Sequence, residues 1–167
     1  MVRSKGALVV LLVAVMALGL TAWAAAEEAP PYHIIADVVR GGKNATGPVC
    51  VLNSVFKLGE QVVWRAEIFD GKTGKLLEKA DIDRLGLKAV AEVDGVGTFP
   101  LTYGPHPKEA PQVYFWAGAW EIPAIFKTGS FSWRIVVTDK NGNKSVYEPV
   151  GGRRPEMPGS WIVIEKR

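Results

Sequence analysis

Residues 131–150 read FSWRIVVTDKNGNKSVYEPV, and large apolar side chains occupy every second position of the first half. One side of an extended chain would there carry Phe131, Trp133, Ile135 and Val137. This period of two is typical of a β-strand with one buried face. The Asn-Gly pair that follows favours a tight hairpin turn, because both residues tolerate positive φ angles. The segment therefore predicts two antiparallel strands.

The same alternation recurs along the chain. Residues 60–75, EQVVWRAEIFDGKTGK, combine an alternating strand with a turn rich in Asp and Gly. Further strands are expected within residues 32–40, 87–103, 112–120 and 160–166. A helical signal of one or two turns is confined to residues 76–88. About seven or eight short strands separated by turns predict an all-β fold, an antiparallel β-sandwich.

Two stretches carry a resemblance to a known fold. FKLGEQVVWRAEIFD, followed further along by IPAIFKTGSFSWRIVVTDKNGN, resembles the immunoglobulin-like or fibronectin-type-III-like sandwiches of bacterial exported proteins. The likeness covers most of residues 48–148 and implies the fold, but no function, because this sandwich hosts many unrelated binding roles. The chain departs from antibody domains in lacking their Cys…Trp…Cys set, so the core has to be stable without an inter-sheet disulfide.

The N-terminus has the layout of a secretory signal peptide. Arg3 and Lys5 precede an apolar run that starts at Ala7, and the run ends in small residues that offer cleavage after Ala24 or Ala26. We expect a cleaved signal peptide over residues 1–26, with an uncleaved membrane anchor as the alternative, since roughly 20 apolar residues can span a bilayer. The sequence thus predicts an exported protein, periplasmic or extracellular, with one domain over residues 27–167.

Charge narrows the choice of partner. The chain has 167 residues with 20 Lys and Arg against 17 Asp and Glu, and removing residues 1–26 leaves 18 basic residues against 17 acidic ones. A nearly neutral surface without a dense basic run gives no support for binding to nucleic acid, and membrane contact is expected only if the first segment stays uncleaved.

The strand over residues 112–120 is unusually aromatic. Tyr114, Trp116 and Trp120 share one face, and Val113 and Phe115 lie on the other. Either the three large rings fill the core, or they form an exposed platform that stacks on sugar rings or on an apolar patch of a partner. Both alternatives stay open at this stage.

A second group of residues matches a copper ligand set in number. After residue 26 the chain holds Cys50, His33, His106 and Met157 as its only cysteine, histidines and methionine. Blue-copper sites combine two imidazoles, a thiolate and a distant thioether, but in cupredoxins three of these lie close together in one loop. Here they are widely spread, and the apolar neighbours of Cys50 favour burial of its side chain. A metal site is therefore a minor alternative, and no cofactor is expected.

These observations favour a binding role over catalysis. The chain contains no phosphate-binding glycine loop, haem-attachment motif or nucleophile motif, so we expect no enzyme. We expect an exported accessory domain that docks onto another exported or envelope protein. Candidate contacts, besides the aromatic strand, are the proline-rich loop around His106 and the basic pair Arg153 and Arg154. A metal- or redox-linked periplasmic protein using Cys50 with His33 or His106, and a carbohydrate-binding module, are the alternatives.

Overall fold

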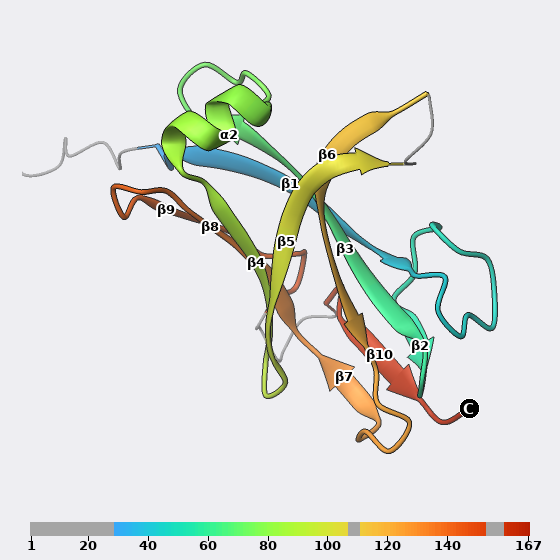
Figure 1. Cartoon of the computed structure of the whole chain (residues 1–167). Coiled ribbons are helices and arrows are strands. Elements are labelled where there is room, and N and C mark those ends of the chain that lie inside the picture. The colour runs from blue at the N-terminus through green and yellow to red at the C-terminus, as the bar shows by residue number, and fades with distance from the viewer. Residues whose placement is uncertain (1–28, 107–110, 153–158) are drawn as a thin grey trace, which may run out of the picture.

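A computed structural model describes residues 29–106, 111–152 and 159–167 (Figure 1). These residues form ten strands and one short helix. The strands are β1 (Tyr32–Arg40), β2 (Val55–Lys57), β3 (Gln61–Asp70), β4 (Lys88–Val93), β5 (Gly97–His106), β6 (Val113–Glu121), β7 (Gly129–Phe131), β8 (Trp133–Thr138), β9 (Lys144–Tyr147) and β10 (Ile162–Glu165). The helix is α2 (Lys79–Leu85).

Seven of the strands form one sheet in the order β1-β3-β6-β5-β4-β8-β9, and all neighbours in it are antiparallel. The sheet curls until its edge strands, β1 and β9, approach each other, so it is nearly closed. A smaller sheet of order β2-β10-β7 lies at one end of the curled sheet (Figure 1). Within it β10 is parallel to β2 and antiparallel to β7.

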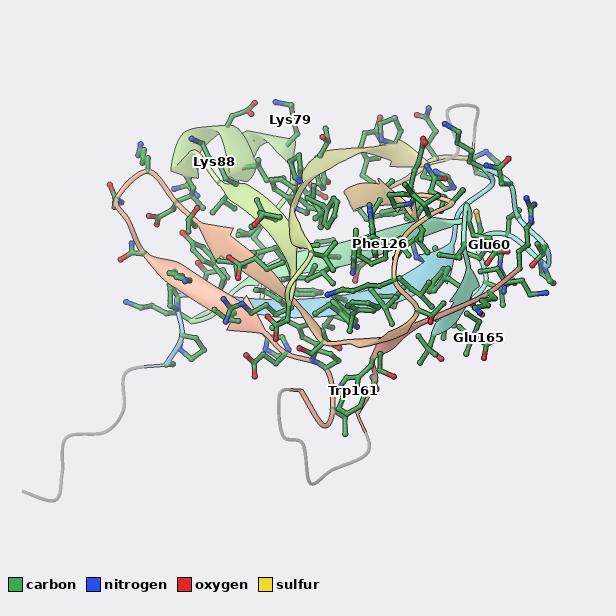
Figure 2. The ribbon with its side chains drawn as sticks, turned by 90° about the horizontal axis from the view of Figure 1, so that it is seen from below. Glu60, Lys79, Lys88, Phe126, Trp161 and Glu165 are labelled. Atoms are coloured by element: carbon green, nitrogen blue, oxygen red, sulfur yellow. The ribbon has the colours of Figure 1, made fainter. Side chains whose placement is uncertain are left out.

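The alternating residues identified in the sequence form the core. Val62, Trp64, Ala66 and Ile68 of β3 are all buried, and so are Phe131, Trp133, Ile135 and Val137. Figure 2 shows how such side chains fill the space that the curled sheet encloses. The period of two in β3 and β8 therefore did mark the inward face of each strand.

A row of aromatic rings runs through this core. Trp64 stacks on Phe99 with 5.2 Å between ring centroids, and Phe99 in turn lies 5.5 Å from Trp120. Trp120 then meets Phe126 edge to face at 5.2 Å. Rings in offset or edge contact contribute to stability beyond the area they bury. The row links β3, β5, β6 and the turn that follows β6.

The predicted all-β class is confirmed, but the described residues form ten strands where seven or eight were expected. Three-residue β2 carries no alternating pattern long enough to be recognised, and a break at Ser132 divides the expected single strand into β7 and β8. The predicted helical turns are present as α2, which ends where Gly86 adopts a left-handed conformation with φ of 64°. The expected signal segment, residues 1–26, lies outside the described residues.

The described residues include no helix that is both long and apolar enough to cross a membrane.

The two edges of the large sheet are tied together at one end. The backbone N–H of Tyr32, at the start of β1, donates a 3.0 Å hydrogen bond to the hydroxyl of Ser145 in β9. The Tyr32 hydroxyl donates a 2.7 Å hydrogen bond to Asp139, which lies in the turn between β8 and β9. We call these contacts the Tyr32 latch.

Candidate binding surface

The outward face of β1, β3 and β6 carries a groove of about 420 Å³, which we call the outer-face groove. Its walls include Ile35, Arg65, Glu67, His106, Val113 and Phe115. Four strands contribute to it, because His106 is the last residue of β5.

Strand register explains why these residues meet. Ile35 lies opposite Glu67, and Asp37 lies opposite Arg65, in the β1–β3 ladder. Val113 lies opposite His106 in the β5–β6 ladder. Because side chains alternate across a sheet, these positions point outward wherever their neighbours in sequence point into the core. Residues far apart in the chain thus form one surface.

The charges of the groove are only partly paired. Arg65 donates two hydrogen bonds to Asp37, one of them from Nε to Oδ1 at 2.8 Å. This hydrogen bond raises the pKa of Arg65 above its usual value, although burial opposes the change. The Glu67 carboxylate makes no hydrogen bond or ion pair within the described part of the chain. A ligand with a cationic group therefore has a carboxylate to bind.

The groove is bordered by exposed apolar side chains. Ile35 is 53% exposed and Val113 is 59% exposed. Apolar side chains gathered around a groove are a common feature of binding surfaces. The surface is therefore suited to a partner that brings its own apolar side chain.

The aromatic side chains of strand β6 differ in exposure. Trp116 and Trp120 are buried, and only Tyr114 of the three rings is exposed. Gly118 between the tryptophans has no room for a side chain, because a Cβ there would lie 2.7 Å from the carbonyl oxygen of Pro100. The core alternative therefore describes both tryptophans, and a stacking platform of three rings is not present. The large rings face inward because only that face is closed off by the curled sheet.

The other predicted contact residues are placed only in part. His106 lines the outer-face groove, with its ring centroid 5.5 Å from that of Phe115. Arg153 and Arg154 lie outside the described residues.

The expectation that Cys50 is buried is wrong. Its thiol is free and exposed, and the residue has a positive φ of 60°. The loop joins the edge of β1 through its backbone, with the N–H of Cys50 donating a 2.9 Å hydrogen bond to the carbonyl of Arg40. Val49, Val51 and Leu52 beside it are exposed as well. Apolar neighbours in sequence therefore do not bury this cysteine, because backbone contacts attach the loop.

The copper ligand set is not assembled in the described residues. His33 contacts the ring of Phe69, whereas His106 lies in the outer-face groove. No three His, Cys, Asp or Glu side chains among the residues described are grouped so that they could hold a metal ion. Met157 lies outside the described part of the chain.

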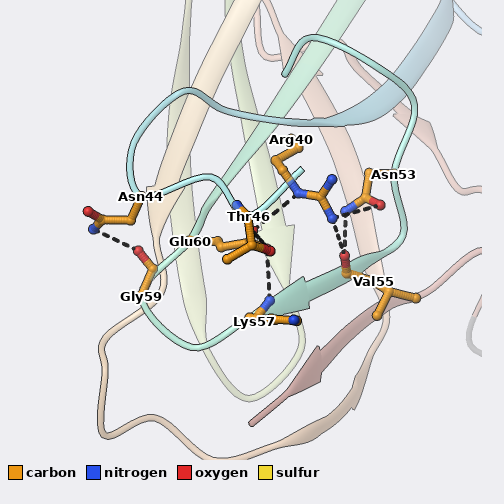
Figure 3. A network of polar contacts seen from close by, with 8 residues as sticks. All are labelled: Arg40, Asn44, Thr46, Asn53, Val55, Lys57, Gly59 and Glu60. Carbon is orange, nitrogen blue, oxygen red and sulfur yellow. Dashed lines mark hydrogen bonds and ion pairs between the residues drawn. The ribbon is translucent and has the colours of Figure 1, made fainter. Parts of the chain in front are cut away.

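One buried charge was missed in the sequence. Glu60 is fully buried and accepts hydrogen bonds from the backbone N–H and hydroxyl of Thr46, both at 2.7 Å, and from the N–H of Lys57 at 2.8 Å (Figure 3). The Arg40 Nε atom lies 3.3 Å from its carboxylate. Burial raises the pKa of Glu60, but these hydrogen bonds together with Arg40 outweigh it and leave the pKa below its usual value.

This Glu60 network anchors the loop that carries Cys50. Thr46 belongs to that loop, and Arg40 also donates to the carbonyl of Val55 at 3.3 Å. No pattern in the sequence predicts that Glu60 is buried in such a network, because a single Glu before a strand is ordinarily a surface residue. The network joins this loop to β2 and to the residue before β3.

No protein-family model matches the chain, and no curated protein matches it at a significant level of similarity.

Proposed function

We propose that the chain is an exported, non-catalytic binding domain that docks onto a partner protein through the outer-face groove. The observation that carries the proposal is the combination, in one groove, of exposed apolar walls at Ile35 and Val113 with the carboxylate of Glu67, which has no partner among the described residues. Interfaces commonly combine an apolar centre with a few placed charges.

We further propose that the fold is the immunoglobulin-like sandwich that the sequence resembles. The pairing of β5 supports this, because its residues 97–101 pair with β4 and its residues 102–106 pair with β6, so two parts of the sheet meet within β5. The ring contact between Trp64 of β3 and Phe99 of β5 joins these two parts in the core. Sandwiches of this kind use exposed sheet faces and loops for binding. On this assignment the outer-face groove lies on the layer formed by β1, β3, β6 and residues 102–106 of β5.

The groove favours a partner segment with an apolar side chain next to a basic one. The apolar side chain would contact Ile35, Val113 and Phe115, which removes apolar surface from water. The basic group would pair with Glu67, because Asp37, the other carboxylate of the groove, is already bound by Arg65. Such pairing adds specificity and faster association more than affinity.

Site-specific crosslinking in the producing cells tests the proposal. A photoreactive residue in place of Ile35 is expected to capture one defined partner, and Val113→Glu in the same chain is expected to abolish the adduct. Ile125→Glu is the matched control, because Ile125 is 96% exposed and belongs to the turn after β6. Both variants should keep the melting temperature of the parent, since each changes an exposed side chain.

An adduct that persists with Val113→Glu, or that forms equally well from position 125, would contradict docking through this groove. Export is tested separately by sequencing the N-terminus of the protein from fractionated cells. We expect mature chains that begin after Ala24 or Ala26.

A further inference from the structure

The strands β4, β8 and β9 carry an outward face on a different part of the sheet from the outer-face groove. Register places Lys88 of β4 opposite Thr138 of β8, and Thr138 opposite Lys144 of β9. Both lysines are exposed, whereas Ala89 and Ser145, which follow them in sequence, are buried on the inward face. The two lysines therefore flank Thr138 on the outside of the sheet. Their Cα atoms lie about 10 Å apart, because neighbouring strands are about 4.8 Å apart.

A third lysine lies beside this pair. The backbone N–H of Lys140, in the turn after β8, donates a 3.1 Å hydrogen bond to the carbonyl of Leu85, the last residue of α2. A Cβ atom at Gly86 would lie 3.1 Å from that of Lys140, so the turn packs against the chain just before Lys88. Figure 2 labels Lys88 at this end of β4. We call Lys88, Lys140 and Lys144 the lysine corner.

No carboxylate among the described residues pairs with the lysine corner. The Nζ atom of Lys140 donates a 2.9 Å hydrogen bond to the carbonyl of Arg84, and the other two Nζ atoms make no hydrogen bond or ion pair within the described part of the chain. The carboxylate of Asp139, next to Lys140 in sequence, accepts hydrogen bonds from Tyr32 and Asn143 instead. Three basic side chains are thus gathered without a carboxylate partner, in a chain that is nearly neutral after residue 26.

An apolar row crosses the same face next to the lysine corner. Register pairs join its members across β5, β4, β8 and β9, in the order Pro100, Val90, Val136 and Val146. Val136 is buried between its neighbours, whereas Pro100 is exposed and Val146 is 45% exposed. Val90 lies two residues along its strand from Lys88, which is a distance of about 7 Å. Exposed apolar surface and free positive charge therefore lie side by side.

The charges on the other side of the apolar row differ from those of the lysine corner. Arg134 of β8 donates a 2.6 Å hydrogen bond from Nε to the carboxylate of Glu92 in β4, so these two charges satisfy each other. Glu148, which is exposed directly after β9, adds a negative charge at this end of the strands. A ligand that covers the row thus meets free positive charge on the side of the lysine corner.

We propose that this face binds an acidic segment of a partner protein, which places carboxylates on the lysine corner and an apolar side chain on the apolar row. Carboxylates fit the corner because opposite charges across an interface speed association and fix orientation. An apolar side chain fits the row because the contact removes the exposed surface of Pro100 and Val146 from water.

The spacing of the two features narrows the segment. In an extended chain, side chains on one side repeat every two residues, or about 7 Å, which matches the step from the lysine corner to the apolar row. We therefore expect an acidic residue two positions from an apolar one. The face shares no residue with the outer-face groove, so either proposal can fail without the other.

Peptide selection tests the inference. A random heptapeptide display library is selected on the mature protein and counter-selected on the double variant Lys88→Glu/Lys144→Glu. Enriched peptides are expected to be acidic with an apolar residue, and to shift the backbone amide NMR signals of β4, β8 and β9. They should lose at least about tenfold in affinity for the double variant. Lys127→Glu/Lys166→Glu is the matched control, because it changes the net charge equally at two exposed lysines elsewhere.

A second pair of variants tests the apolar row. Val146→Thr keeps the shape of the side chain but replaces a methyl group with a hydroxyl, so the enriched peptides should bind about threefold more weakly. Ile125→Thr is its control, since Ile125 is 96% exposed and lies in the turn after β6. All these variants change exposed side chains and should keep the melting temperature of the parent.

Four outcomes would overturn the proposal. They are a selection that enriches no peptide, enriched peptides without acidic residues, equal binding to both double variants, and binding that ignores Val146→Thr. One further result would assign the surface to another ligand. If no peptide is enriched but the protein sediments with vesicles of phosphatidylglycerol and phosphatidylethanolamine, and Lys88→Glu/Lys144→Glu abolishes this, the lysine corner binds anionic lipid.

Discussion

The hydroxyl of Tyr32 donates a 2.7 Å hydrogen bond to the carboxylate of Asp139, a residue 107 positions further along the chain. The bond joins strand β1 to the turn before β9, so it ties together the two edges of the large sheet. Burial, followed by the hydrogen bond and the charge of Asp139, raises the pKa of Tyr32 to about 12. The bonds from Tyr32 and Asn143 lower the pKa of Asp139 to about 2.

Tyr32→Phe is expected to lower the melting temperature by a few degrees and to change its pH dependence. The stabilisation from Asp139 is present above its unfolded pKa of about 3.9, and it is lost as the pH falls toward a folded pKa of about 2. The stabilisation from Tyr32 is complete below about pH 10 and is lost as the pH rises toward 12.

Thermal melts from pH 2 to pH 12 measure both limbs. The variant should have a flatter profile in each window, and Tyr114→Phe, which changes an exposed tyrosine, serves as the control. Profiles of identical shape for Tyr32→Phe and the parent would show that the latch does not contribute.

Glu60→Gln is expected to reduce the free energy of unfolding by about 2 kcal/mol, because hydrogen bonds to a charged group are stronger than neutral ones. The folded pKa of Glu60 is lowered, so its stabilisation is present above the unfolded value of about 4.3 and is lost as the pH falls below it. Urea denaturation at pH 7 and at pH 3 measures the difference. Glu121→Gln is the control, since Glu121 forms an exposed pair with Lys43. Equal losses at both pH values would contradict a charged Glu60.

Trp120→Ala is expected to cost about 3–5 kcal/mol of unfolding free energy, as is usual when a large buried ring is removed. Tyr114→Ala on the same strand should change it by no more than about 0.5 kcal/mol, because that ring is largely exposed. Chemical denaturation of the two variants gives both values. A small cost at Trp120 would return the tryptophans to the surface and restore the platform hypothesis.

The thiol of Cys50 is expected to react with a disulfide reagent in the native protein within about tenfold of its rate in denaturant, because it is exposed. Absorbance after reagent addition follows the reaction, and Cys50→Ser gives the baseline. A native rate slower by several orders of magnitude would mean that the cysteine loop is covered in solution.

Local sequence patterns predict the inward faces of the long strands. They do not predict which face is buried where long-range contacts determine it. Trp64 and Ile135 are fully buried, as the alternation indicated. In β6 both faces are apolar, so the pattern alone could not say which one faces the core. The burial of its two tryptophans follows from the curl of the whole sheet.

The candidate site was less accessible to sequence reasoning than the fold. His106 was selected for its proline-rich loop, yet its neighbours Ile35 and Glu67 come from strands whose register no local pattern reports. The exposure of Cys50 has no local sequence signal, because the loop attaches through its backbone to the edge of β1, and such attachment does not depend on apolar side chains.

The carboxylate of Asp139 also has a local role, since it accepts hydrogen bonds from the backbone N–H of Asn141 at 2.8 Å and from the side-chain amide of Asn143 at 2.9 Å within its own turn. Hairpins form within microseconds, whereas bringing Tyr32 to the same carboxylate requires closure of a long loop. The two roles should therefore separate in time. In stopped-flow experiments we expect Asn143→Ala to slow refolding and Tyr32→Phe mainly to speed unfolding. The Asp139 carboxylate would then stabilise the hairpin already in the folding transition state, and its bond to Tyr32 would form only after that state.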